Sequence, residues 1–201
     1  MTRQMTEAAA HSLPKGVRVE GMTAAAGFPV IASRESYDFA AREVPEAYSR
    51  AAGPHDAVVI GCFGDPGLEA LREIAREPVF GLAESSIREA DALGEPFAIL
   101  TMGQAWVGIL EERVALAAPR SRFAGVFAGN GTGLDVQRRE EAVFAELARL
   151  ADEAVAAGAR TLILGGGAFA GRAERLRTGA RLIDCVEATM RAAAMASGAA
   201  A

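Results

Sequence analysis

Short apolar runs alternate with longer amphipathic stretches along most of this chain. The runs of strand length lie at residues 17–23, 56–62, 78–82, 97–101, 123–127, 161–164 and 181–184. Helical periodicity marks residues 68–76, 107–117 and 138–157 between them. Strands that alternate with helices are typical of parallel sheets covered on both faces. The pattern therefore predicts an α/β fold.

The chain also contains an internal repeat of one strand–loop–helix–strand unit. The sequence VVIGC at 58–62 corresponds to LILGG at 162–166, and GLAE at 81–84 corresponds to DCVE at 184–187. In this register Cys62 faces Gly166. A repeat of this kind predicts two lobes related by a pseudo-twofold axis, each a parallel sheet with flanking helices.

We expect the first lobe to span residues 1–94 and the second to span 95–184, with a C-terminal helix at 185–199 that packs back onto the first. Ligands of open parallel sheets bind beyond the carboxyl ends of the strands. In a pseudo-symmetric pair these ends can face each other. The two loops that follow the matched strands are therefore expected to meet in one cleft, which would hold the active site.

Composition and charge narrow the function classes. The chain has 201 residues, of which 51% are hydrophobic and 23% charged, as in ordinary globular proteins. A net charge of −5 offers no electrostatic footprint for nucleic acid or an anionic membrane. No apolar run matches a bilayer span, and the first ten residues lack the apolar core of a signal peptide. We therefore expect a cytoplasmic protein whose two cysteines are free thiols without a zinc pattern.

The most informative segment is the sequence GCFGDPG at residues 61–67, which follows a predicted buried strand and precedes a helix. Asp65 fits an N-cap and Pro66 fits the first helical position. The positive end of that helix favours thiolate over thiol, which predicts a partly exposed Cys62 with a lowered pKa. The alternative, a buried cysteine that fills a turn, is equally consistent with the loop alone.

This loop resembles the first cysteine loop of hydantoin racemases, in the aspartate/glutamate/hydantoin racemase family. The resemblance is carried by residues 56–68, 78–84, 159–165 and 182–184, and it covers most of the chain, more weakly between Glu95 and Gly158. It implies two pseudo-symmetric lobes around a small-molecule substrate, an amino acid, hydantoin or related carboxylate. It also implies chemistry without cofactor or metal. One thiolate, here Cys62, removes the proton alpha to a carbonyl or carboxylate, and a second thiol on the opposite face returns one.

The chain departs from the family at the second thiol. The family's second cysteine loop corresponds to LGGGAFAG at 164–171, where the cysteine position is Gly166. Glycine has no side chain that could carry a proton, so we expect two-base racemisation to be impaired. Cys185 does not align with the lost residue, although it follows a strand end in the same lobe. We favour a packing role for Cys185 over a role as rearranged second proton carrier.

A second departure lies at the start of the chain. Residues 2–6 resemble the beginning of the helix that follows the family's first strand, and that strand and most of its loop are absent. We expect the gene to encode them upstream of Met1, because an unpaired interior position in a sheet is costly.

Other site residues are expected around the two loops. We assign substrate binding to Gly61, Phe63 and Gly64 in the first loop and to Gly165 and Gly167 in the second. At a strand end, Thr101 could give its hydroxyl to a substrate carboxylate or to the backbone, and the sequence leaves both open. The glycine-rich stretch at 165–171 superficially resembles a dinucleotide fingerprint, but too little chain follows it to complete a nucleotide-binding unit.

Three functions are consistent with these residues. The first is a racemase-type isomerase acting at the carbon alpha to a carbonyl or carboxylate. The second is a one-thiol decarboxylase or lyase of the same fold. The resemblance extends to arylmalonate decarboxylase, whose single catalytic cysteine lies in the lobe opposite to Cys62. The third is a non-catalytic binder of small molecules. In each case we expect a homo-oligomer with no nucleic-acid or membrane partner.

Overall fold

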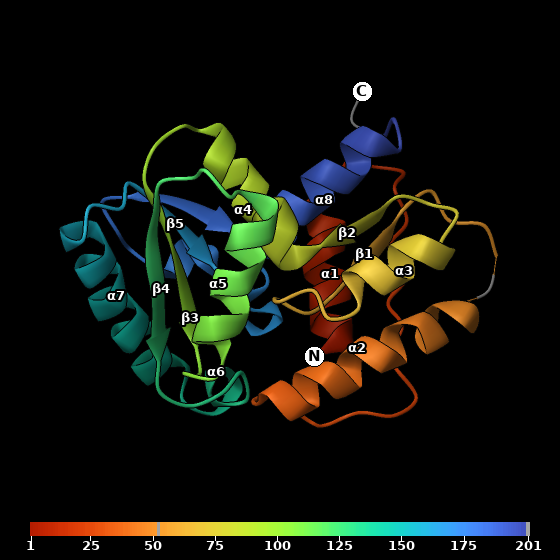
Figure 1. Ribbon diagram of the computed structural model, residues 1–201, viewed down its shortest axis with the longest axis horizontal. Helices are drawn as coiled ribbons and strands as arrows, with labels where there is room; N and C mark the ends of the chain where they lie inside the picture. Colours follow the sequence, from red (N-terminus) through yellow and green to blue (C-terminus); the bar gives the residue numbers. More distant parts are fainter. Residues whose placement is uncertain (52, 200–201) are drawn as a thin grey trace.

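The computed structural model describes residues 1–51 and 53–199, and it contains two parallel sheets with helices packed around them (Figure 1). The first sheet pairs β1 (Val58–Ile60) with β2 (Val79–Gly81). The second has the order β4-β3-β5-β6. Its strands are β3 (Phe97–Met102), β4 (Phe123–Gly129), β5 (Thr161–Leu164) and β6 (Arg181–Asp184). The predicted α/β fold with parallel sheets is confirmed.

Eight α-helices and two short 3₁₀ turns are present among the described residues. The helices are α1 (Thr2–His11), α2 (Arg34–Ser49), α3 (Leu68–Ile74), α4 (Leu82–Ala92), α5 (Trp106–Ala117), α6 (Asp135–Arg138), α7 (Glu140–Ala156) and α8 (Cys185–Ala196). The 3₁₀ turns are η1 (Gly167–Phe169) and η2 (Ala173–Arg175). Across residues 1–51 and 53–199, no helix has the length and apolar character needed to cross a membrane.

The second sheet forms the centre of the core, and its two faces are covered by different helices. Every residue of β3 and β5 is buried. Phe97, Ile99 and Ile163 point toward α4, α5 and α8, whereas Leu100 and Leu164 point toward α7. This alternation follows from the two-residue period of a strand. Figure 1 shows α7 on the outer side of this sheet and α4 and α5 on the inner side.

Helices α4 and α8 connect the two sheets. Helix α4 packs against α5, β5 and β6 of the second part and against β2 of the first. Helix α8 packs against α4, α1, β1 and β2. The turn at residues 93–96 separates α4 from β3, where the sequence placed the boundary between lobes. The division into 1–94 and 95–184 remains a proposal.

Residues 17–23 do not form the predicted strand. In the described part of the chain β1 pairs only with β2. Beside β1 lies a groove of about 900 Å³, and residues 19–29 line its wall together with residues 57–62. A strand requires backbone hydrogen bonds to a neighbour. Residues 17–23 pair with no strand of the described chain, and they are irregular and mostly exposed.

Candidate active site

The segment that carries Cys62 leaves β1 and turns before α3. The Asp65 N–H donates to the Cys62 carbonyl at 3.0 Å, and the helix starts only at Leu68. The residue that precedes it, Gly67, has the left-handed φ of 74°. The predicted N-cap at Asp65 and first helical position at Pro66 are therefore wrong. Asp65 itself has a φ of 56°, and its carboxylate is directed at a different helix.

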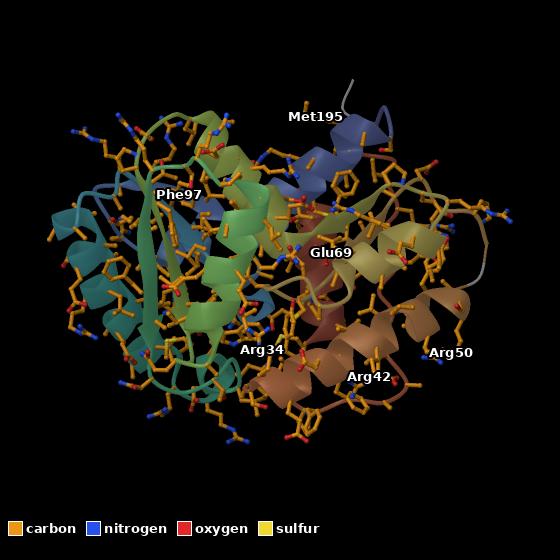
Figure 2. The ribbon with its side chains drawn as sticks, in the orientation of Figure 1. Arg34, Arg42, Arg50, Glu69, Phe97 and Met195 are labelled. Atoms are coloured by element: carbon orange, nitrogen blue, oxygen red, sulfur yellow. The ribbon has the colours of Figure 1, made fainter. Side chains whose placement is uncertain are left out.

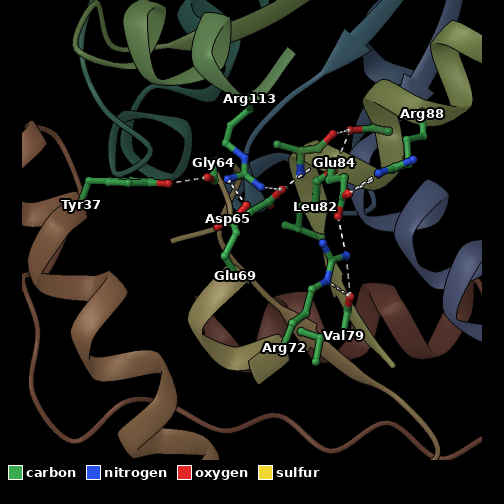
Figure 3. A network of polar contacts seen from close by, with 12 residues as sticks. Tyr37, Gly64, Asp65, Glu69, Arg72, Val79, Leu82, Glu84, Arg88 and Arg113 are labelled. Atoms are coloured by element: carbon green, nitrogen blue, oxygen red, sulfur yellow. Dashed lines mark hydrogen bonds and ion pairs between the residues drawn. The ribbon is translucent and has the colours of Figure 1, made fainter. Parts of the chain in front are cut away.

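That helix is α4. The fully buried Asp65 carboxylate accepts hydrogen bonds from the Ala83 N–H at 2.8 Å and from the Glu84 N–H at 2.7 Å (Figure 3). Burial raises the pKa of Asp65 to about 6, although these two amides and Arg113 act in the opposite direction. The loop after β1 is thus tied to the N-terminus of α4 by a carboxylate, and local capping preferences gave no indication of it.

Two further elements hold the same loop. Tyr37 of α2 donates its hydroxyl to the Gly64 carbonyl at 2.9 Å. Arg113 of α5 lies 3.9 Å from the Asp65 carboxylate and donates to Glu69 of α3 at 2.8 Å. Figure 2 labels Glu69 at the junction of α3 and α5, and Figure 3 shows Arg113 above the loop. The loop is therefore fixed by contacts from both parts of the chain.

Trp106 closes the loop on the side of α5. A Cβ on Gly64 would lie 2.7 Å from the indole ring, so only glycine fits there without a shift. The indole also packs edge-on against Tyr37 and joins the main apolar cluster. Trp106 therefore has a packing role beside the loop.

Cys62 lies at the end of β1 and lines the groove beside that strand. Its side chain is partly exposed, as expected. The surrounding protein raises the pKa of Cys62 to about 12, first by burial and second by the charge of Asp65. The predicted lowering of this pKa is therefore wrong. The charge that acts on the thiol is that of the Asp65 carboxylate, which favours the protonated form.

This environment predicts slow alkylation of Cys62 in the resting protein. At pH 7.5 a thiol of pKa about 12 holds on the order of 10³-fold less thiolate than an ordinary cysteine. The rate with iodoacetamide should rise up to at least pH 10 without levelling, and peptide mapping separates Cys62 from Cys185. N-acetylcysteine is the reference. A rate that reaches its half-maximum near pH 8.5 or below would contradict the raised pKa.

The second loop follows β5, and the structure places it against the first. The Phe63 ring lies over Gly165 so closely that a Cβ there would overlap it. The Met5 side chain of α1 contacts both loops, at Gly61 and at Gly167. The structure thus brings Gly61, Phe63, Gly165 and Gly167 together. Met5, which sequence reasoning did not select, occupies the space between the loops.

Gly166, the position of the missing second thiol, has a φ of 142°. A Cβ there would lie 3.1 Å from the Phe169 ring. Gly166→Cys should therefore lower the free energy of unfolding by about 1–3 kcal/mol, because an L side chain is strained in this conformation. Gly179→Cys is the matched control, since that exposed glycine has open space around its Cβ position. Equal urea midpoints for the two variants would contradict the expected strain.

The remaining candidates, Cys185 and Thr101, are both buried. Cys185 is 1% exposed within the apolar core at the start of α8. Burial and then the charge of Asp184 raise the pKa of Cys185, and a backbone contact from Gly166 offsets part of this. Thr101 donates its hydroxyl to the Gly165 carbonyl at 2.9 Å. These positions match the packing role for Cys185 and the backbone role for Thr101.

The described residues contain no cluster of three or more histidine, cysteine or acidic side chains that could hold a metal ion. The groove at Cys62 also receives Leu82 of α4 and Val186 of α8, but none of the glycines at 165–167. Of the two loops, only the one that follows β1 lines the groove, at Gly61, Cys62 and Pro66.

Comparison with known proteins gives a consistent result. The family model described as Asp/Glu/Hydantoin racemase matches residues 1–193. The hydantoin racemase of Paenarthrobacter aurescens is 31% identical over 198 residues, which covers 96% of this chain and 84% of that protein. The crystal structure of allantoin racemase from Pseudomonas fluorescens superposes with a TM-score of 0.92 at 27% identity. The match covers 96% of this chain and 84% of the allantoin racemase chain. A mutant of arylmalonate decarboxylase has a TM-score of 0.60 at 21% identity, with 84% and 78% covered, which shows a shared fold alone.

Proposed function

The chain belongs to the Asp/Glu/hydantoin racemase family, and from this premise we propose that it is an isomerase acting at the carbon alpha to a carbonyl or carboxylate. The reacting thiol is Cys62, and the proton transfer uses no cofactor. The observation that carries the proposal is the position of this thiol. It stands at the carboxyl end of a parallel strand, opens onto a groove, and belongs to a loop held from α2, α4 and α5.

The proposed reaction begins when Cys62 loses its proton to solvent water. The thiolate then takes the proton from the alpha carbon, so that an S–H bond forms, the C–H bond breaks and the electron pair moves onto the carbonyl oxygen. Backbone N–H groups of the loop after β1, which lines the groove at Gly61 and Cys62, supply hydrogen bonds to the resulting enolate. Water returns a proton to the opposite face, because Gly166 has no side chain and Cys185 is buried in the core.

Supply of the second proton by water has a measurable consequence. A thiol on one face exchanges its proton with solvent and can return a deuteron to the same face, which gives exchange without inversion. We therefore expect deuterium to enter at the alpha carbon faster than the enantiomer forms. NMR and chiral chromatography on one reaction in D₂O measure the two rates. Equal rates from both enantiomers would indicate a second positioned acid and contradict this mechanism.

A second function is favoured by one observation, the raised pKa of Cys62. A protonated thiol is the form that a one-thiol decarboxylase requires. Loss of carbon dioxide leaves a carbanion, the thiol donates its proton to one face, and water reprotonates the thiolate. Release of carbon dioxide from a substituted malonate, with one enantiomer in excess, would support this function over the isomerase.

Hydantoins and allantoin are the first substrates to test, because the relatives named above carry those names. Aspartate, glutamate and substituted malonates complete the panel, and spontaneous exchange in buffer is subtracted. Exchange with inversion supports the isomerase, whereas neither exchange nor carbon dioxide release indicates a binder. A homo-oligomeric state and a cytoplasmic location also remain proposals, and light scattering tests the first.

A further inference from the structure

The repeated units satisfy the same two helix amides in different ways. In the second unit Asp184 accepts from the Val186 N–H at 2.8 Å and from the Glu187 N–H at 3.2 Å, an ordinary N-cap of α8. In the first unit the corresponding amides are those of Ala83 and Glu84. They bind the Asp65 carboxylate, which lies 18 residues before Ala83 in the chain.

Gly81, which corresponds to Asp184, leaves room for this arrangement. It has a φ of −106°, which any residue can adopt, so its backbone does not require glycine. A Cβ on Gly81 would overlap the Asp65 carboxylate, and the three nearest atoms to that Cβ position all belong to Asp65. The absence of a side chain at residue 81 thus admits a carboxylate from another segment.

Asp65 satisfies these amides at a higher cost than Asp184 does. Its backbone is in the left-handed region at φ 56°, and its carboxylate is completely buried. A non-glycine residue in that conformation is strained, and an ordinary N-cap avoids this strain. This arrangement connects α4 to the loop that carries Cys62. Asp65 belongs to that loop, and its N–H donates to the Cys62 carbonyl.

We propose that Asp65 is a positioning residue, which anchors the Cys62 loop to the N-terminus of α4 and thereby fixes the thiol. This inference rests on the proposed role of Cys62. Asp65 does not line the groove and acts through the loop. The connection also links the thiol to α4, the helix that packs against both sheets.

Two variants separate capping from anchoring. Asp65→Ala removes both. Asp65→Ala/Gly81→Asp moves the carboxylate to the position that it has in the second unit, beside the same amides, so the helix regains its cap and the loop remains free. The carboxylate at residue 81 also restores the negative charge near Cys62. The double variant and wild type therefore have a similar thiol pKa, and a difference in their alkylation rates reports on the loop. Urea unfolding and the alkylation rates of Cys62 and Cys185 are the readouts.

In Asp65→Ala we expect a lower unfolding midpoint and alkylation of Cys62 that is faster by roughly tenfold. The double variant should regain the midpoint while Cys62 remains more reactive than in wild type. Cys185, buried in the core, should label only through global unfolding in every variant and serves as the internal reference. A double variant in which the alkylation rate of Cys62 returns to that of wild type would overturn the proposal, because a cap and a nearby charge, without the anchor, would then account for Asp65.

Urea dependence keeps the test decisive if the double variant does not regain stability. Alkylation of Cys62 in Asp65→Ala should be nearly independent of urea, as local loop release predicts, and that of Cys185 should rise steeply. If both cysteines show the same steep dependence, the loop is not released locally and the proposal fails. The readout does not need turnover. Failure of the proposed function would appear separately, as alpha-carbon exchange that survives Cys62→Ser.

Discussion

Replacement of Cys62 by serine should lower deuterium exchange at the alpha carbon by about 10²–10⁴-fold, the range typical of a positioned acid or base. The serine hydroxyl is nearly isosteric with the thiol but is a far weaker acid. The loop keeps its contacts, because they do not involve the sulfur. Tyr37 still bonds to Gly64, and Asp65 still bonds to the first amides of α4. Exchange measured by NMR on the substrate that gives the fastest wild-type rate is the test.

Cys185→Ala is the matched control for the loss of a thiol. Cys185 lies in the core at 1% exposure and does not line the groove. Its removal should cost some stability and leave exchange unchanged at a temperature at which the variant is folded. If Cys62→Ser retains the wild-type rate, the proton is carried by another group. If Cys185→Ala also abolishes exchange in folded protein, the packing role assigned to Cys185 is wrong.

Sequence patterns predicted those parts of the fold in which a segment specifies its own structure. The strands β5 and β6 were predicted with their observed bounds, since buried strands of an α/β protein are short, continuous apolar runs. The error at residues 17–23 has a different origin. A strand depends on a neighbour as well as on its own pattern. Residues 17–23 pair with no strand among the described residues, and residues 19–23 line the groove beside β1 instead.

Prediction of the site succeeded for proximity and failed for electrostatics. The repeat indicated that the loops after β1 and β5 belong together, and Phe63 does pack on Gly165. The N-cap at Asp65 was inferred from its neighbours in sequence, yet its carboxylate binds amides 18 and 19 residues away. The thiol pKa was inferred from a helix dipole, but burial and the Asp65 charge outweigh it. Neither effect is visible until the chain is folded.

Arg113→Met should be strongly destabilising, because it removes the cation nearest to a buried carboxylate. The Arg113 side chain is 8% exposed and that of Asp65 is 0% exposed, with 3.9 Å between their charged atoms. Loss of one partner of a buried pair typically costs about 3–5 kcal/mol. The two α4 amides remain bound to Asp65, so we expect the lower end of this range at pH 8. Urea unfolding at pH 5 and pH 8 measures the loss.

The loss should grow with pH. Burial raises the pKa of Asp65 from its ordinary 3.8 to about 6, so the folded state holds this proton more tightly than the unfolded chain. The stability that this group contributes is therefore greatest at low pH and declines as the pH rises from about 4 through 6. Arg113 lowers the pKa of Asp65, and Arg113→Met raises it further. The decline then continues to higher pH, and the gap to wild type widens between pH 5 and pH 8.

Arg88→Met provides the contrast, because it breaks an ion pair in which the arginine is exposed. The Arg88 guanidinium lies 2.7 Å from Glu84 with 62% of its side chain exposed, and an exposed pair contributes about 0.2–1 kcal/mol. Burial acts to raise the pKa of Glu84, but hydrogen bonds from Arg72 and Arg88 outweigh it and lower this pKa. The stability from this group is therefore present at neutral pH and declines in acid, the reverse of Asp65. A loss of stability in Arg113→Met that is equal at pH 5 and pH 8 would contradict this account. It would mean that Arg113 acts through packing and its hydrogen bond to Glu69, and that the charged Asp65 does not depend on Arg113.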